Sequence, residues 1–140
     1  RDSRPLETFE AQDFLPFKAG IQAGAGSVLV NHNVIEAMDP DHPASLSPKV
    51  HEILRDALGF DGVILTDDLD MEAITKAYGA DTAAVQAVAA GNDMILSSRY
   101  TIEIPAVIEA VKNKTLSEDQ INASVKRVLT WKMDLGLIEN

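Results

Sequence analysis

Three short apolar runs, each ending in polar side chains, constrain the fold of this chain more than any other feature. The runs with the polar residues that end them are Ser27–Val30 with Asn31 and His32, Gly62–Thr66 with Asp67 and Asp68, and Asp93–Leu96 with Ser97 and Ser98. A continuous apolar run of this length, bounded by Gly or polar residues, is typical of a strand buried on both faces. The pattern therefore predicts three strands of a parallel sheet, which we place at residues 27–32, 62–66 and 93–98.

Helical spacing of apolar residues separates these runs. The expected helices are Leu6–Ala23, Pro48–Leu58, Asp81–Ala90, Pro105–Lys112 and Ser117–Gly136, with a short helical turn between Met71 and Ala80. Pro16 predicts either a kink in the first of them or its division into two short helices, and Ser47 followed by Pro48 is a typical helix start. Strands that alternate with helices indicate an α/β fold with a parallel sheet covered by helices. We interpret residues 1–140 as a single domain.

Three parallel strands would leave two open sheet edges. We therefore expect residues 1–140 to form part of a larger sheet or barrel whose upstream part is missing. Unpaired edges are templates for pairing with another chain, and the cut would expose side chains such as Val28, Val30, Met94 and Leu96. A homo-oligomer joined through these edges is the expected consequence.

Composition excludes several classes of function. The net charge of −10 argues against electrostatic binding to nucleic acid or to an anionic membrane. The absence of cysteine excludes disulfides, thiolate metal sites and a cysteine nucleophile. No apolar run approaches the ~20 residues that a transmembrane helix needs.

Asp67 and Asp68 are the first candidates for catalytic residues. In α/β proteins, ligands bind at the carboxyl ends of the strands, and these two carboxylates directly follow the second apolar run. Adjacent strand residues point to opposite faces, so one carboxylate is expected to face the site while the other supports a loop. The alternative is that both are helix caps or solvated loop residues.

Asn31, His32 and Ser97 occupy equivalent positions on the other two strands. An imidazole there can bind a ligand hydroxyl or support a carboxylate, or it can simply be a hydrogen-bonded residue of the rim. His42 and His51 are weaker candidates, and the charged neighbours of His51 suggest a solvent-facing ring. No histidine spacing supports a metal site.

Five segments of the chain resemble family-3 glycoside hydrolases, in particular the bacterial β-N-acetylhexosaminidase branch. The segments are Ser27–His32, Asp39–Pro40, Pro43–Pro48, Leu58–Leu69 and Ala90–Leu96. The block Gly-Phe-Asp-Gly-Val-Ile-Leu-Thr-Asp-Asp is the most specific of them. The β-glucosidase branch usually has Ser-Asp-Trp at this point, so Asp68 favours the hexosaminidase branch.

The resemblance implies the last three strands of a (β/α)₈ barrel and an enzyme that hydrolyses terminal β-linked N-acetylglucosamine. It implies that Asp67 is the nucleophile, and it implies no metal and no organic cofactor. From their positions at the strand ends, we expect four further residues to support the site or bind substrate: His32, Asn31, Asp68 and Ser97. The general acid/base of the family lies in a Lys-His-Phe-Pro-Gly-His-Gly context, which these residues do not contain. A bacterial protein of this kind can be cytoplasmic, secreted or associated with the cell wall.

Two alternatives remain open at this stage. Without the acid/base segment, the chain could be a catalytically inactive structural or oligomerising module. The run Val63–Asp70 also matches the strand and Asp-x-Asp motif of haloacid-dehalogenase-like phosphatases, in which Asp68 and Asp70 would ligate Mg²⁺. Against that reading, Glu72 stands where those enzymes usually have Thr or Val.

Overall fold

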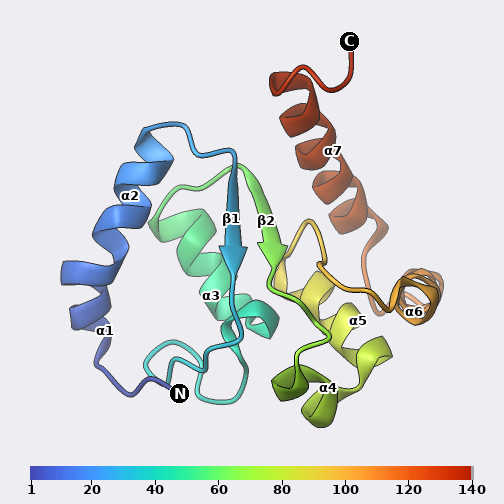
Figure 1. The fold of residues 1–140 in the computed structure, drawn as a ribbon, viewed down its shortest axis with the longest axis horizontal. Helices are drawn as coiled ribbons and strands as arrows, with labels where there is room; N and C mark the ends of the chain where they lie inside the picture. Colours follow the sequence, from blue (N-terminus) through green and yellow to red (C-terminus); the bar gives the residue numbers. More distant parts are fainter. Residues whose placement is uncertain (140) are drawn as a thin grey trace.

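The computed structural model describes residues 1–139 and shows a small parallel sheet surrounded by helices (Figure 1). The elements are α1 (Leu6–Thr8), the π-helical turn η1 (Phe9–Asp13), α2 (Phe14–Gln22), β1 (Ser27–Val30), the 3-10 turn η2 (Ala44–Leu46), α3 (Pro48–Glu52), the π-helical turn η3 (Ile53–Ala57), β2 (Val63–Thr66), α4 (Glu72–Tyr78), α5 (Ala80–Ala90), α6 (Tyr100–Lys112) and α7 (Glu118–Asp134). Strands and helices alternate, as the sequence pattern predicts for an α/β fold.

The two strands pair in parallel, in a register that runs from Ser27 opposite Val63 to Val30 opposite Thr66. They lie side by side at the centre of the molecule with their carboxyl ends together (Figure 1). Parallel strands need a helical crossover between them, and α3 with η3 supplies it. The first two predicted strands are therefore confirmed, although β1 ends at Val30 rather than at residue 32.

The third predicted strand, residues 93–98, is not a strand in the structure. It contributes one isolated parallel bridge, between Met94 and Leu65. The backbone N–H of Met94 donates to the carbonyl of Ile64, but the N–H of Leu96 donates to the side-chain hydroxyl of Thr66 at 3.0 Å. The Thr66 side chain thus takes the place of the Thr66 carbonyl as the acceptor for Leu96, two residues after the Met94 bond. The segment runs beside β2 without completing a ladder, and the sheet described here has two strands.

The core lies on both faces of β2, because Val63 and Ile64 point to opposite faces and neither is exposed to solvent. One cluster consists of Val30, Ala44, Leu54, Phe60 and Ile64. A second cluster consists of Leu46, Leu69, Ile74, Ala83, Ala84 and Ala87. Val30 is 7% exposed and belongs to this core, so the expectation that it faces solvent is wrong; Met94 and Leu96 are exposed as expected.

Local sequence signals account for most helix boundaries. The helical segment runs without a gap from α1 to α2 and includes a π-helical turn at Phe9–Asp13. Pro16 lies in α2, shortly after this turn, and has no backbone N–H to donate. The αL conformation of Gly91, with φ 114°, ends α5. The predicted start of α6 at Pro105 is wrong: the helix begins at Tyr100, and the proline lies inside it.

The start of α3 is tied to a buried carboxylate. The hydroxyl of Ser47 accepts from the N–H of Val50 at 3.3 Å and donates to Asp39 at 2.7 Å. Burial raises the pKa of Asp39, but hydrogen bonds from Ser47, from the N–H of Asp41 and from the His42 ring outweigh it and hold that pKa below its usual range. Ionised Asp39 is therefore the form that the folded chain prefers.

We expect Ser47→Ala to lower the free energy of unfolding by about 2–3 kcal/mol, from the lost cap and the lost charge-assisted bond. The pKa of Asp39 is depressed on folding, so its contribution is present above the unfolded value of roughly 4 and fades as pH falls through the folded value. The deficit of the variant should therefore be largest near neutral pH and smaller in acid.

Urea unfolding of the 140-residue chain at several pH values measures this deficit. Ser117→Ala is the matched control, since Ser117 caps α7 through the N–H of Asp119 and has no carboxylate partner among the described residues. Its deficit should be about 1 kcal/mol and independent of pH. A Ser47→Ala deficit that does not change with pH would show that Asp39 gains nothing from this serine.

Candidate functional site

The candidate site lies at the carboxyl ends of β1 and β2, where Asp67 directly follows the second strand. The backbone N–H of Asp67 donates to the carbonyl of Val30 at 2.9 Å and extends the pairing of the strands by one bond. Asp67 is therefore held by the sheet itself, although its side chain is past the last strand residue. This is the position that the sequence predicts for the carboxylate.

The two oxygens of the Asp67 carboxylate differ in their surroundings. Oδ1 accepts a hydrogen bond from the backbone N–H of Asp68 at 2.8 Å. Oδ2 accepts none from residues 1–139, and the residue is only half-buried. One oxygen is therefore fixed by the backbone, while the other is available to a molecule that enters from solvent.

Asp68 stabilises the loop that follows β2. Its carboxylate Oδ1 accepts from the N–H of Asp70 at 2.9 Å, in a local turn. Its backbone carbonyl accepts from Nε2 of His32 at 2.9 Å. Oδ2 of Asp68, like Oδ2 of Asp67, has no donor among residues 1–139; the two residues differ in how they are held, Asp67 by the sheet and Asp68 by the turn.

His32 joins the two loops that follow the strands. Its Nε2 contacts the carbonyl of Asp68, and its Nδ1 lies 2.7 Å from the hydroxyl of Ser45. A carbonyl oxygen can only accept, so Nε2 carries a proton; in the neutral ring, Nδ1 then accepts from Ser45. Both ring nitrogens of His32 are engaged, which makes the ring a support rather than a ligand-binding group.

Asn31 and Ser97 are at the same end of the sheet but are not joined to Asp67. The side-chain oxygen of Asn31 accepts from the N–H of Asn33 at 3.1 Å, and its side chain is exposed. The hydroxyl of Ser97 donates to the buried Glu103 at 2.7 Å. The sequence placed Asn31 and Ser97 with Asp67 only because all three follow apolar runs. Within residues 1–139, neither side chain forms a hydrogen bond with Asp67.

An ion pair beside Asp67 escaped the sequence reasoning. Asp70 accepts from the hydroxyl and the N–H of Ser98, and Arg99 lies 2.9 Å from its other oxygen. The Ser98 hydroxyl and N–H, with Arg99, hold the pKa of Asp70 below its usual range. The contact joins the loop after β2 to the loop after Met94, and its only sequence signal was the polar run at residues 97–99.

The environment of His51 is a correction. Its ring is 3% exposed, although its charged neighbours predicted solvent. Nδ1 donates to the carbonyl of Ser47 at 2.8 Å, and the His51 side chain lies against Gly91. His42 instead lies beside Asp39, 3.2 Å from its carboxylate. Neither histidine contacts the site.

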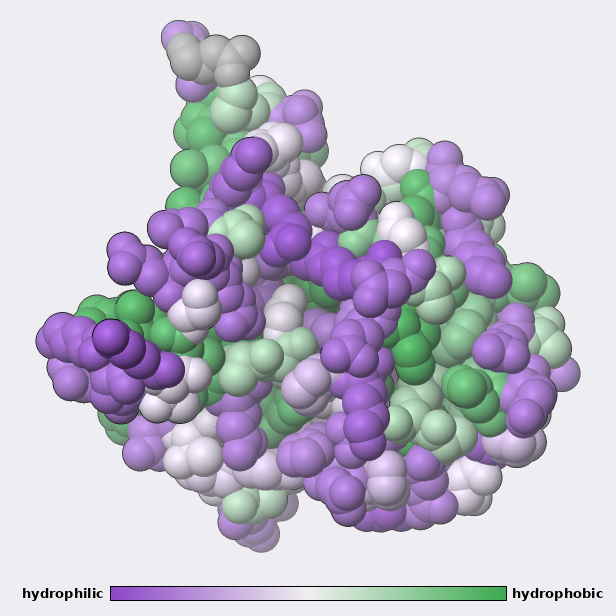
Figure 2. Space-filling view, turned by 180° about the vertical axis from the view of Figure 1, so that it is seen from behind, coloured by the Kyte–Doolittle hydropathy of each residue, from purple (hydrophilic) through white to green (hydrophobic). Residues whose placement is uncertain are grey.

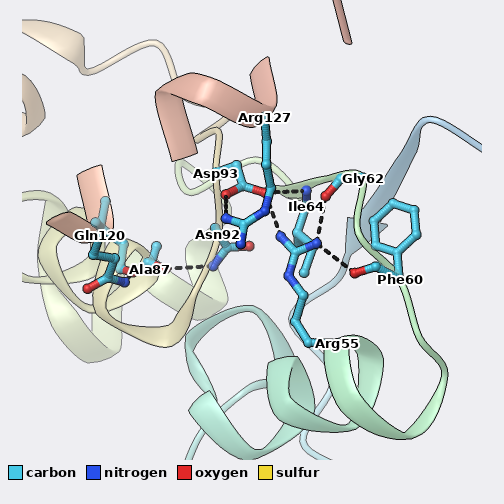
Figure 3. Close-up of polar contacts among 10 residues, drawn as sticks. Arg55, Phe60, Gly62, Ile64, Ala87, Asn92, Asp93, Gln120 and Arg127 are labelled. Atoms are coloured by element: carbon cyan, nitrogen blue, oxygen red, sulfur yellow. Dashed lines mark hydrogen bonds and ion pairs between the residues drawn. The ribbon is translucent and has the colours of Figure 1, made fainter. Parts of the chain in front are cut away.

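A buried cluster of one carboxylate and two guanidinium groups lies at the opposite, amino end of β2, and both carboxylate oxygens in it have partners. Asp93 has no exposed side-chain surface and contacts Arg55 at 2.6 Å and Arg127 at 3.0 Å (Figure 3). The same carboxylate accepts from the N–H of Ile64 at 2.9 Å, and Arg55 also donates to the carbonyl of Gly62. Every oxygen of Asp93 is satisfied, so this cluster joins η3, β2 and α7 and is a structural centre.

Within residues 1–139, no group of three or more His, Cys, Asp or Glu side chains is arranged to hold a metal ion. In the same residues, none of the helices is both long and apolar enough to cross a membrane.

Known proteins resemble this chain closely in sequence and in fold. The beta-hexosaminidases of Stenotrophomonas maltophilia (strain K279a) and Xanthomonas axonopodis pv. citri (strain 306) are each 36% identical over 132 residues, which is 93% of this chain. The structure of a glycoside hydrolase family 3 beta-N-acetylglucosaminidase from Paenibacillus sp. str. FPU-7 superposes with a TM-score of 0.93 at 35% identity. It covers 99% of this chain and 27% of that protein.

The beta-N-acetylhexosaminidase from Beutenbergia cavernae DSM 12333 gives a TM-score of 0.76 at 33% identity, over 83% of this chain and 36% of that protein. The chain spans about two fifths of the length of the curated relatives it matches, 39% in each case above. Residues 1–131 match the family description "Glycosyl hydrolase family 3 N terminal domain". The chain therefore belongs to glycosyl hydrolase family 3.

Proposed function

We propose that this chain carries the nucleophile of a retaining β-N-acetylhexosaminidase, and that Asp67 is that nucleophile. The observation that carries the proposal is the Asp67 carboxylate, which stands at the carboxyl end of β2 with Oδ1 bound by a backbone N–H and Oδ2 without a protein donor among the described residues. The substrate class comes from the relatives, which are named beta-hexosaminidases and beta-N-acetylglucosaminidases.

The chemistry requires two groups on opposite sides of the scissile bond. Oδ2 of Asp67 would attack the anomeric carbon and form a covalent glycosyl ester while the glycosidic C–O bond breaks. An acid must protonate the departing oxygen, and the same group, now a base, takes a proton from the water that hydrolyses the ester. In retaining enzymes the second group stands ~5–5.5 Å from the nucleophile.

The described residues offer the first group and no good candidate for the second. His32 has an imidazole in the loops at this end, but its two nitrogens are occupied by Ser45 and by the Asp68 carbonyl. The Lys-His-Phe-Pro-Gly-His-Gly segment that would hold the acid/base is not among these 140 residues. The phosphatase alternative loses its support, because the chain belongs to family 3 and Asp70 is already paired with Ser98 and Arg99.

We expect the 140-residue chain by itself to turn over p-nitrophenyl N-acetyl-β-glucosaminide far more slowly than a complete glycosidase. General acid/base catalysis contributes ~10²–10⁴-fold, and its loss alone should bring kcat well below the usual range of roughly 1–10³ s⁻¹. Release of p-nitrophenol by the purified chain measures this. Turnover within the usual range would mean that these residues contain an acid/base, and His32 would be the first to replace.

Joining the chain to the missing segments tests the proposed function itself. In the chimaera, this chain replaces the matching segment of the Stenotrophomonas maltophilia beta-hexosaminidase, which is 36% identical. We expect the chimaera to hydrolyse the aryl glycoside and to release the β-anomer first, as NMR of the fresh product would show. First release of the α-anomer would contradict a covalent intermediate on Asp67.

A second proposal, association of the chain with itself, is favoured by its exposed apolar faces. Hydrophobic residues run along the projecting helix α7 and its C-terminal extension (Figure 2). The exposed ones are Val125, Leu129, Met133, Leu135, Leu137 and Ile138, and Leu29 is exposed on β1 at the sheet edge. Large apolar patches on a protein surface mark association sites.

We expect the 140-residue chain to form a homo-oligomer at micromolar concentration, with an interface above ~1,000 Å². Sedimentation velocity measures this, and the double variant Leu129→Glu with Val125→Glu should shift the population towards the monomer. A monomer of 15.1 kDa that keeps its circular dichroism on dilution would contradict the proposal.

A further inference from the structure

We infer that Ser45, His32 and the two peptide groups of Asp68 form a hydrogen-bond relay that orients the Asp67 carboxylate and makes Oδ2 its attacking oxygen. The inference rests on the proposed function, since it concerns how the same carboxylate is positioned. It adds Ser45 and His32 as positioning residues, which act on the nucleophile without touching a substrate.

The relay begins at Ser45, which is rigidly placed. Its side chain is fully buried, its backbone N–H donates to the carbonyl of Asn31 at 3.0 Å, and its own carbonyl accepts from the side chain of Asn92 at 2.7 Å. The turn η2 is thereby tied both to the end of β1 and to the segment after α5. The hydroxyl of Ser45 can therefore meet the His32 ring at a fixed point, 2.7 Å from Nδ1.

The Asp68 carbonyl selects the tautomer of His32, and the hydroxyl of Ser45 completes it as the donor to Nδ1. Because the Asp68 carbonyl can only accept, the proton of the neutral ring must be on Nε2, and Nδ1 must then accept from Ser45. Without Ser45 the ring would lose the partner that holds its plane and its Nδ1 lone pair would be left without a donor. Ser45 thus stands to His32 as an orienting partner stands to a metal-bound or catalytic histidine.

The relay ends at the carboxylate. Asp68 is held on both sides of its Cα, since its carbonyl accepts from His32 and its N–H donates to Oδ1 of Asp67. Fixing the carbonyl limits rotation about the backbone of Asp68 and so keeps the N–H aimed at Oδ1. The electron pairs of Oδ1 are partly committed to this bond, and Oδ2 is left as the oxygen that can form the glycosyl ester.

Nuclear magnetic resonance of the 140-residue chain tests the relay without any turnover. We expect the ¹⁵N shifts of His32 to show a neutral ring protonated on Nε2, and we expect Ser45→Ala to keep this tautomer while the Nδ1 signal moves, because that nitrogen loses its donor. The amide of Asp68 should exchange with solvent at least about tenfold faster in His32→Ala, while the amide of Phe60 keeps its rate. A ring protonated on Nδ1 in the unmodified chain would overturn the inference.

Kinetics of the chimaera test the consequence. A small displacement of a reacting group can cost 10²-fold in rate, so we expect His32→Ala to lower kcat roughly 10²-fold with KM changed less than about twofold. His32→Gln, whose amide can donate to the same carbonyl, should recover most of the loss. His42→Ala is the matched control, because His42 lies in the same loop but contacts Asp39, and it should leave kcat unchanged.

The two possible failures are distinguishable. If Asp67→Ala inactivates the chimaera while soluble, folded His32→Ala and Ser45→Ala keep the full kcat, the relay is wrong and the proposed function stands. If Asp67→Ala is active, the proposed function itself fails. Should His32→Ala not fold, His32→Gln and Ser45→Ala decide, because an unchanged kcat together with an unchanged exchange rate at Asp68 in Ser45→Ala would overturn the relay.

Discussion

Replacing Asp67 by alanine is expected to lower kcat of the chimaera by about 10⁴- to 10⁶-fold, which is the size of loss that follows removal of a covalent nucleophile. The reason is structural: Asp67 directly follows β2, its Oδ1 is bound by the N–H of Asp68, and its Oδ2 has no protein donor among the described residues. The release of p-nitrophenol from the aryl glycoside measures the loss. The fold should be unaffected, because the residue is only half-buried and the hydrogen bond of its side chain is to the neighbouring N–H of Asp68.

Two further variants separate the loss of the nucleophile from other effects. Asp67→Asn keeps an oxygen that can accept from the N–H of Asp68 and should be almost as inactive as Asp67→Ala. Asp61→Ala removes an exposed carboxylate just before β2, at its amino end, and should leave kcat within about twofold. An Asp67→Asn variant with near-normal activity would contradict a role for this carboxylate in bond formation.

Replacing Asp93 by alanine is expected to lower the free energy of unfolding of the 140-residue chain by about 3–5 kcal/mol. The carboxylate is completely buried and holds Arg55 and Arg127 together with the N–H of Ile64 (Figure 3). Removing it leaves two positive charges side by side and a buried donor without a partner. Burial already lowers the pKa of Arg55, while Asp93 supports its charge, so the loss of Asp93 is not offset locally.

Urea unfolding measures the effect, and the chain offers a matched control. Glu109→Ala breaks an ion pair with Lys112 whose side chains are 66% exposed, and exposed pairs contribute only about 0–1 kcal/mol. Asp93→Asn should fall between the two, since it keeps the shape but loses the charge. Equal stability of Asp93→Ala and Glu109→Ala would mean that the buried cluster contributes nothing to the fold.

The elements that sequence predicts well are those with a local cause. Buried runs predict β1 and β2 because a parallel strand is apolar on both faces, and Ser47 with Pro48 predicts the start of α3 because the cap is made within one turn. The position of Asp67 follows directly from the end of such a run. Family 3 membership, which the residues around Asp67 already suggested, is confirmed by the comparison over residues 1–131.

The features that sequence misses have causes far away in the chain. The apolar run after Asp93 predicts a strand, but a ladder needs backbone partners at each step, and Thr66 supplies a hydroxyl instead. His51 is buried against Gly91, forty residues on, and its own charged neighbours in the chain do not indicate this contact. Likewise the two partners of the His32 ring are distant in the chain, since Ser45 is thirteen residues away and Asp68 thirty-six residues away.

The stereochemistry of azide rescue tests the role of Asp67 most directly. Azide is small enough to take the place of the missing carboxylate in the Asp67→Ala chimaera, and a dinitrophenyl glycoside needs no acid to leave. The nitrogen would then bond to the anomeric carbon from the face that Oδ2 occupies, as the phenolate departs. We expect azide to restore turnover and the product to be the α-glycosyl azide. Formation of the β-glycosyl azide, or no rescue in a chimaera whose unmodified form is active, would contradict Asp67 as the nucleophile.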